Sequence, residues 1–123
     1  MKFAIIRGFQ DPRDPKAKPR FAVVLGMENG RMALAPVTTY PARTGRTPDG
    51  AVRLSDRSEA FKGTGFDADE VAISMRDVVL VNTDSVYLRG HKVVGRLDLH
   101  RDKRVFDQFV MLLRQYGMPT AQY

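Results

Sequence analysis

The sequence of 123 residues contains no cysteine, and this absence excludes several kinds of chemistry. Without thiols the chain has no disulfide framework, no thiolate metal site and no cysteine nucleophile. Long hydrophobic runs are lacking too, because even residues 21–25 and 78–81 are short. A membrane-spanning helix needs about 20 apolar residues, and a secretory signal needs an apolar region of about 7 or more. We therefore expect a soluble protein of the reducing cytoplasm, with no membrane partner.

Familiar catalytic motifs are also missing. The two histidines, His91 and His100, flank a predicted strand and do not form the His-Glu-x-x-His pattern of a zinc site. The Gly-Thr-Gly of residues 63–65 is only a fragment of a phosphate-binding loop, and no helix pattern follows it. The acidic residues at 67–70 lack the spacing of a calcium loop and are typical of a solvated turn. We expect no metal and no other cofactor.

Negative charge is in short supply. The chain has 14 acidic residues against 20 Lys and Arg, which gives a net charge of +6 and a pI of about 10.0. Clustered Lys and Arg bind polyanions by releasing the counterions that surround phosphates. A nucleic acid is therefore the favoured partner. The alternative is that the charge serves solubility alone.

The remaining patterns favour short strands followed by one helix. Residues 7–20 contain three prolines, which exclude a helix and predict a stiff loop. Asn29-Gly30, between two apolar runs, predicts a β-hairpin. Apolar residues at helical spacing over 103–116, after Asp102 and before Gly117, predict an α-helix. Strands are predicted at residues 3–6, 21–25, 32–37, 52–54, 70–74, 78–82 and 91–97, with 86–88 as an extension of the sixth.

These elements predict one domain over residues 1–123 that is mainly β-structure. Many short strands before a single helix are typical of a small β-barrel or strongly curled sheet. The C-terminal helix, at about residues 103–116, is expected to close this sheet at one end. Its apolar stripe is expected to be core rather than a cofactor site.

Basic and hydroxyl residues gather in the two loops that flank the predicted hairpin. The proline-rich loop supplies Lys18 and Arg20, and the loop after the second strand supplies Thr38 and Thr39. Because the hairpin closes at Asn29-Gly30, antiparallel pairing places these distant ends side by side. Arginine offers a fork for phosphate oxygens, and threonine offers a short donor. The pattern predicts a phosphodiester-binding mouth at this end of the sheet.

The second loop continues with Tyr40, Arg43 and Arg46. An aromatic ring beside cations suits an unpaired base and its phosphates. The alternative interpretation is that Tyr40 packs on the surface and that the two arginines are solvated.

Two segments resemble the MazF/PemK (also called Kid) toxins of bacterial toxin–antitoxin systems. They are Lys-Pro-Arg-Phe-Ala-Val-Val-Leu at residues 18–25 and Leu-Ala-Pro-Val-Thr-Thr at residues 34–39. That family reads Asp-Pro, a polar loop, Arg-Pro and a Val/Leu run, followed by Ala-Pro-Ile-Thr-Ser. The matching elements here lie at residues 11–12 or 14–15, 18–19, 35–39, 71–80 and 95–97, ahead of the terminal helix.

The resemblance implies an SH3-like barrel that forms a homodimer and is neutralised by an acidic antitoxin protein of a type II system. It implies metal-independent, sequence-specific cleavage of single-stranded RNA, in which the 2′-hydroxyl attacks the adjacent phosphorus. By position, the catalytic pair is Thr38 and Lys18, where the family usually has arginine. Arg20 is a reserve candidate for the catalytic cation. The RNA-binding residues implied are Arg20, Thr39, Tyr40, Arg43 and Arg46.

Two other interpretations stay open. A non-catalytic barrel of the same fold would bind nucleic acid or a protein partner, with salt-dependent binding and no cleavage. A small structural or assembly protein of a phage or mobile element would carry its basic charge incidentally and bind no polyanion. Incubation with defined RNA distinguishes the endoribonuclease toxin, which would cleave it, from these two interpretations.

Overall fold

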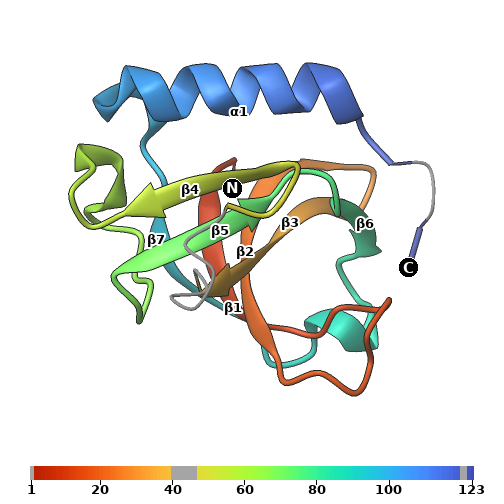
Figure 1. Cartoon of the computed structure of the whole chain (residues 1–123). Coiled ribbons are helices and arrows are strands. Elements are labelled where there is room, and N and C mark those ends of the chain that lie inside the picture. The colour runs from red at the N-terminus through yellow and green to blue at the C-terminus, as the bar shows by residue number, and fades with distance from the viewer. Residues whose placement is uncertain (1, 40–46, 120–121) are drawn as a thin grey trace.

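The computed structural model describes residues 2–39, 47–119 and 122–123, which are mainly β-structure with one α-helix (Figure 1). The strands are β1 (Ala4–Phe9), β2 (Arg20–Glu28), β3 (Arg31–Thr39), β4 (Ala51–Ser55), β5 (Glu70–Ser74), β6 (Val79–Asn82) and β7 (Lys92–Arg96). The 3₁₀ turns are η1 (Glu59–Phe61), η2 (Val86–Leu88) and η3 (Leu99–Arg101), and the C-terminal helix is α1 (Lys103–Tyr116). Among these residues, no helix has the length and apolar character that crossing a membrane requires.

The strands form one sheet in which each ladder between strands is antiparallel. Their order is β4-β5-β3-β2-β1-β7, and β6 also pairs with β3. Within the described ranges no ladder joins β4 to β7, so the sheet is open. Of the two forms predicted, a small barrel or a strongly curled sheet, the barrel is therefore wrong. The prediction of a mainly β-fold with one C-terminal helix is confirmed.

A tight turn at residues 63–65 covers the edge of β7 that closure would require. The carbonyl of Gly63 accepts a hydrogen bond from the backbone N–H of Arg96 at 2.8 Å. A Cβ atom on Gly95 would lie 2.2 Å from the carbonyl oxygen of Thr64, so glycine alone fits there without a shift. The Gly-Thr-Gly segment, considered above as a fragment of a phosphate loop, thus packs against the sheet.

The long strand β3 changes its neighbour halfway along. Residues 31–34 pair with β6, whereas residues 37–39 pair with β5. Pro36, which cannot donate a backbone hydrogen bond, lies between the two halves. This change carries the end of β3 onto β5, where Thr38 is opposite Ala72.

The turn between β2 and β3 confirms the hairpin predicted from Asn29-Gly30. Both residues have positive φ, 53° at Asn29 and 74° at Gly30, as a two-residue hairpin turn favours. Away from the turn, Val23 pairs with Ala35 and the register continues toward the other end of both strands. The hairpin thereby fixes which residues meet at that end.

Successive residues of the central strands pack into two cores, one on each side of the sheet. Ile5 and Val23 belong to the first core, which α1 helps to cover. Ile6 and Val24 belong to the second core, which Leu88 of η2 helps to cover. Because both sides are covered, the central strands are continuous apolar runs in the sequence and show no alternation.

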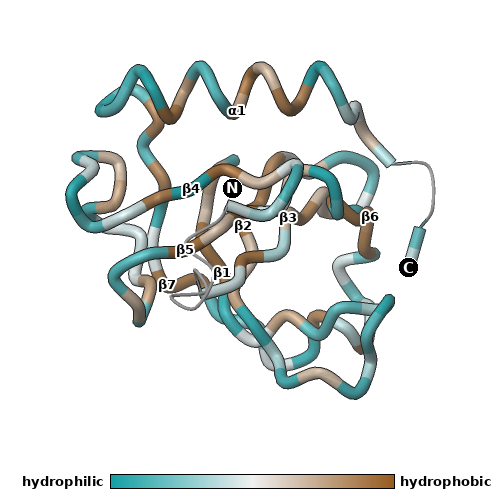
Figure 2. The backbone as a smooth tube through the Cα atoms, viewed as in Figure 1, coloured by the Kyte–Doolittle hydropathy of each residue, from teal (hydrophilic) through white to brown (hydrophobic). Residues whose placement is uncertain are grey.

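Helix α1 lies across one side of the sheet and contacts β4 (Figure 1). Figure 2 shows hydrophobic and hydrophilic segments alternating along it. Val105, Phe109 and Leu112 are buried. Phe106 and Leu113, predicted in the same stripe, are instead 37% and 41% exposed. The sheet therefore covers only part of the apolar surface of the helix.

Both ends of α1 lie at the residues predicted for them. Asp102 accepts hydrogen bonds at Oδ1 from the backbone N–H groups of Arg104 at 3.1 Å and Val105 at 3.4 Å. Its Oδ2 accepts a hydrogen bond from the hydroxyl of Ser58 at 2.6 Å. The bond from Ser58 contributes most to lowering the pKa of this carboxyl, and the backbone bonds add to it. Gly117, with a φ of 66°, ends the helix.

Two local predictions are wrong. Residues 86–88 form the turn η2 and do not extend a strand, because the side chain of Ser85 accepts a hydrogen bond from the backbone N–H of Tyr87 at 3.2 Å. Strand β1 continues past residue 6 into the predicted loop, because β2 and β7 bond to it on both sides. Its last residue, Phe9, lies opposite Arg20 at the start of β2.

Candidate functional site

The start of β2 and the end of β3 line a surface groove, hereafter the Thr38 groove. It is lined by residues 17–21 and 37–39, together with Asp67 and Val71, and has a volume of about 410 Å³. The strand register explains its composition. Ala22 pairs with Pro36, so continuing the antiparallel register by two residues brings Arg20 opposite Thr38.

The four residues that the sequence predicts at this mouth, Lys18, Arg20, Thr38 and Thr39, all line the Thr38 groove. Both threonines are exposed, whereas Val37 beside them is 4% exposed and belongs to the first core. Lys18 is also exposed, and within the described ranges its ammonium group has no carboxylate partner. An exposed ammonium beside hydroxyl donors is a chemically suitable site for a phosphate group.

Arg20 differs from Lys18, because a buried carboxylate holds it. Asp11 is only 6% exposed, and its Oδ2 lies 3.6 Å from Nη2 of Arg20. The same carboxylate lies 3.3 Å from Nε of Arg13 and accepts a hydrogen bond from the backbone N–H of Arg13 at 2.9 Å. Arg13 in turn bonds to the carbonyl of Asp77. Asp11 therefore fixes the position of Arg20 and balances part of its charge.

Asp67 also lines the groove. The ring of Phe66 packs edge-on against the ring of Phe21, with the ring centroids 5.6 Å apart. Because Phe21 follows Arg20 in β2, this contact brings Asp67, the residue after Phe66, to the groove. A carboxylate next to a cation and hydroxyls provides a proton acceptor as well as donors. No local pattern in the sequence predicts that Asp67 lies in the same groove as Lys18 and Thr38.

Tyr40, Arg43 and Arg46 belong to residues 40–46, which lie outside the described residues. His91 Nδ1 lies 2.6 Å from the carbonyl oxygen of Leu88. In the part of the chain that the structure describes, no three His, Asp or Glu side chains gather as a metal ion would require.

No family model matches the sequence, and no curated protein matches it. The chemistry of the Thr38 groove is therefore inferred from its own residues. They offer one cation with no carboxylate partner among the described residues, one cation fixed by Asp11, two hydroxyl donors and one carboxylate. This set suits the binding of a phosphodiester and the transfer of protons around it.

Proposed function

We propose that this protein is a metal-independent, sequence-specific endoribonuclease that cleaves single-stranded RNA, as the MazF/PemK toxins that its motifs resemble do. The observation that carries the proposal is that Lys18, Thr38 and Asp67 line the same groove. These residues come from three separate segments. Together they supply the donor, the cation and the acceptor that transfer of a phosphodiester needs.

In the proposed reaction the carboxylate of Asp67 accepts the proton of a ribose 2′-hydroxyl. The 2′-oxygen attacks the adjacent phosphorus, and the bond from phosphorus to the 5′-oxygen of the next nucleotide breaks. The ammonium of Lys18 gives a proton to that leaving oxygen. The products are a 2′,3′-cyclic phosphate and a 5′-hydroxyl, so atoms and protons balance without a metal or a water molecule.

The other groove residues stabilise charge on the phosphate. The hydroxyl of Thr38 donates to a non-bridging oxygen, on which negative charge increases in the transition state. Arg20, held by Asp11 at 3.6 Å, provides a fixed positive charge beside it. Thr39 is a further donor to the RNA backbone, and we assign Tyr40, Arg43 and Arg46 to RNA binding as well. Because DNA lacks the 2′-hydroxyl, this chemistry selects RNA.

The remaining parts of the proposal concern fold and partners. We propose that the open sheet is a variant of the SH3-like fold of the MazF/PemK family. The exposed residues Met111, Leu113 and Tyr116 of α1 favour a homodimer, since such apolar groups are commonly covered by a partner. The net charge of +6 favours an acidic antitoxin protein as the neutralising partner in the cytoplasm.

A cleavage assay on purified variants tests the proposal. Thr38→Ala and Lys18→Ala should each lower the rate of RNA cleavage by about 10²–10³-fold, the usual cost of removing a donor to a developing charge. Thr83→Ala and Lys16→Ala are matched controls, because Thr83 and Lys16 are exposed and do not line this groove. If the wild-type protein binds RNA but leaves it intact, the proposal of an enzyme is wrong and the interpretation as a non-catalytic binding protein takes its place.

A further inference from the structure

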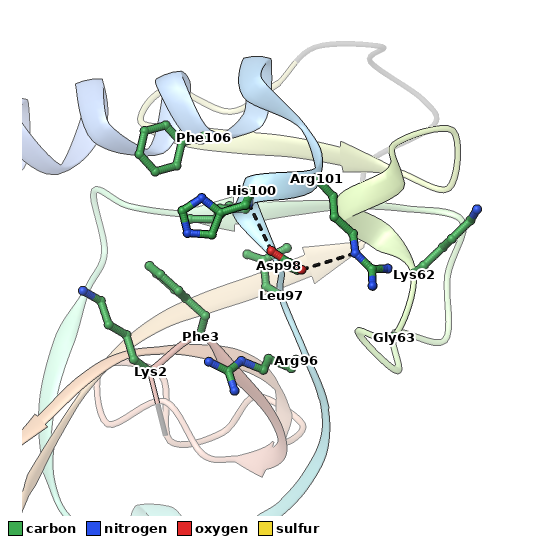
Figure 3. A pocket seen from close by; sticks show the side chains of 11 residues that line it. Lys2, Phe3, Lys62, Gly63, Arg96, Leu97, Asp98, His100, Arg101 and Phe106 are labelled. Carbon is green, nitrogen blue, oxygen red and sulfur yellow. Dashed lines mark hydrogen bonds and ion pairs between the residues drawn. The ribbon is translucent and has the colours of Figure 1, made fainter.

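A second and larger groove lies where the residues before β1, the turn after η1 and the connection from β7 to α1 meet (Figure 3). We refer to it as the Phe3 groove. It is lined by residues 2–3, 62–63 and 96–101 together with Phe106, and has a volume of about 770 Å³. It shares none of its lining residues with the Thr38 groove. A volume of this size accommodates a small organic ligand or part of a polymer.

The Phe3 groove is strongly basic. Among its lining residues Asp98 is the one acid, and it is already engaged by Arg101, whose Nε lies 3.2 Å from its Oδ2. Lys62 pairs with Glu59 at 2.9 Å, and Figure 3 shows its ammonium pointing away from the aromatic side chains. In the described ranges, no carboxylate pairs with the two remaining cations, Lys2 and Arg96. They leave uncompensated positive charge on the groove.

Aromatic rings stand beside these cations. The rings of His100 and Phe106 stack with their centroids 5.9 Å apart at an interplanar angle of 26°. Phe106 is 37% exposed, so this stack is accessible from the groove. The ring of Phe3 lies below them in Figure 3, and Nζ of Lys2 is 5.4 Å from its centroid. Flat rings next to unpaired cations form a surface on which nucleic-acid bases stack.

The backbone at Phe3 is held in an unfavourable conformation. Its φ is 62°, a value that a bulky side chain rarely adopts. Its N–H donates to the carbonyl of Val24 at 2.6 Å, and its carbonyl accepts from the N–H of Leu97 at 2.8 Å. Its ring also packs edge-on against Phe109, with centroids 6.2 Å apart. Strain that neighbours enforce is concentrated at functional sites, which agrees with a role for this groove.

We propose that the Phe3 groove binds single-stranded RNA. Arg96 and Lys2 contact phosphates, and the His100–Phe106 stack receives an unpaired base. The carboxylates of an acidic peptide would satisfy the cations but would not stack on the rings, whereas an unpaired nucleotide does both, and a duplex keeps its bases stacked on one another. This site goes beyond the proposed function, because it needs no cleavage and uses none of the residues of the Thr38 groove.

The test uses a fluorescein-labelled, single-stranded 2′-O-methyl RNA of ten nucleotides, which cannot undergo attack by the 2′-oxygen. Its binding to the full chain is followed by fluorescence anisotropy at several salt concentrations. The double variant Lys2→Glu/Arg96→Glu should weaken binding at least tenfold. It should also lower the salt slope by about 1.4, since each phosphate contact on a single strand contributes roughly 0.7.

Matched controls distinguish binding in the Phe3 groove from a general effect of the protein's net charge. Arg89→Glu/Lys92→Glu changes the charge equally at two exposed residues that line neither groove, and it should weaken binding by less than about threefold. Phe106→Ala should weaken binding about fivefold or more, the lower end for loss of one stacked base. Gln115→Ala, at an exposed residue of the same helix that does not line the Phe3 groove, should change binding little.

The outcomes are distinct from those of the cleavage assay. Equal losses in the two double variants, or displacement of the RNA by polyglutamate at equal charge concentration, would overturn the proposal. If Lys2→Glu/Arg96→Glu proved unstable, Lys2→Gln/Arg96→Gln would take its place, with Arg89→Gln/Lys92→Gln as the control. If RNA binding depends on the Phe3 groove in a protein that cuts no RNA, the proposed Phe3 site is supported and the proposed ribonuclease activity is rejected.

Discussion

Nη2 of Arg20 lies 3.6 Å from Oδ2 of Asp11, so the first residue of β2 is tied to a buried carboxylate in the preceding loop. This ion pair crosses from the loop that follows β1 to the edge of the Thr38 groove. It means that one cation of the groove is anchored by a carboxylate, whereas Lys18 has no carboxylate partner among the described residues. The proposed mechanism therefore gives the two cations different roles, Arg20 in fixed stabilisation and Lys18 in proton transfer.

Replacing Asp11 should affect both stability and activity. Asp11→Ala removes a buried acceptor shared by two arginines, and we expect a loss of about 1–3 kcal/mol in the free energy of unfolding. Arg20 then loses its anchor, so RNA cleavage should fall as well. Asp14→Ala is the matched control, because Asp14 also precedes a proline but is exposed. It should change stability by less than about 0.5 kcal/mol, as measured by urea unfolding.

Asp67 tests the assignment of the proton acceptor. Asp67→Asn keeps the size of the side chain but removes its basic oxygen, and the cleavage rate should fall by about 10²–10⁴-fold. Binding of the 2′-O-methyl RNA should stay equal or tighten, because a negative charge leaves the groove. Asp69→Asn, at an exposed acid of the same turn that does not line the groove, is the control. A rate that does not change with Asp67→Asn would remove Asp67 from the mechanism.

The cap of α1 makes stability depend on pH in acid. Hydrogen bonds from Ser58 and from two backbone N–H groups lower the pKa of the Asp102 carboxyl below its ordinary value of 3.8. The carboxylate therefore stabilises the fold fully above that pH, and this contribution is lost as the pH falls below it. Asp102→Asn should be less stable than the wild type at pH 6, and the difference should shrink below pH 3.8.

Urea unfolding at several pH values measures this effect. Asp84→Asn is the control, because Asp84 lies in an exposed turn and its carboxyl does not cap the helix. Asp102→Ala should cost about 1 kcal/mol at neutral pH, since it removes the cap altogether. A difference between wild type and Asp102→Asn that stays constant down to pH 2.5 would contradict the role given to the charge.

The edge of β7 gives a prediction for the fold itself. Gly95→Ala places a methyl carbon 2.2 Å from the backbone oxygen of Thr64, so the turn at residues 63–65 must move. We expect a loss of about 1–3 kcal/mol, the usual cost of overpacking. Gly26→Ala is the control, because a Cβ there meets nothing within 4 Å. Thermal unfolding of both variants checks this, and equal midpoints would show that the turn is not packed on β7 as described.

Local signals in the sequence predicted much of the fold. Asn29-Gly30 marks its turn because both residues tolerate positive φ, and Asp102 and Gly117 mark the helix because each satisfies backbone groups at one end. Closure of the sheet could not be predicted, because it depends on whether strands distant in sequence meet. The packing of the 63–65 turn on Gly95 is equally non-local, since the glycine is required only by that turn, about thirty residues earlier.

The candidate site divides in the same way. Lys18 and Thr38 could be placed together because one hairpin register brings them to the same end. Asp11 and Asp67 could not, because the first depends on the path of a proline-rich loop and the second on the contact between Phe21 and Phe66. The residues of the Phe3 groove come from separate parts of the chain, so no continuous sequence motif predicts it.

The most direct test of the central claim is the chemistry of the cut ends. A long single-stranded RNA is incubated with the protein in EDTA, and one cut site is mapped. A short RNA with that site is then made with and without a single 2′-deoxy substitution on the nucleotide before the cut. We expect a 2′,3′-cyclic phosphate and a 5′-hydroxyl from the unmodified RNA, and no cut in the substituted one. Cleavage that persists in the 2′-deoxy strand, or that leaves a 5′-phosphate, would contradict it.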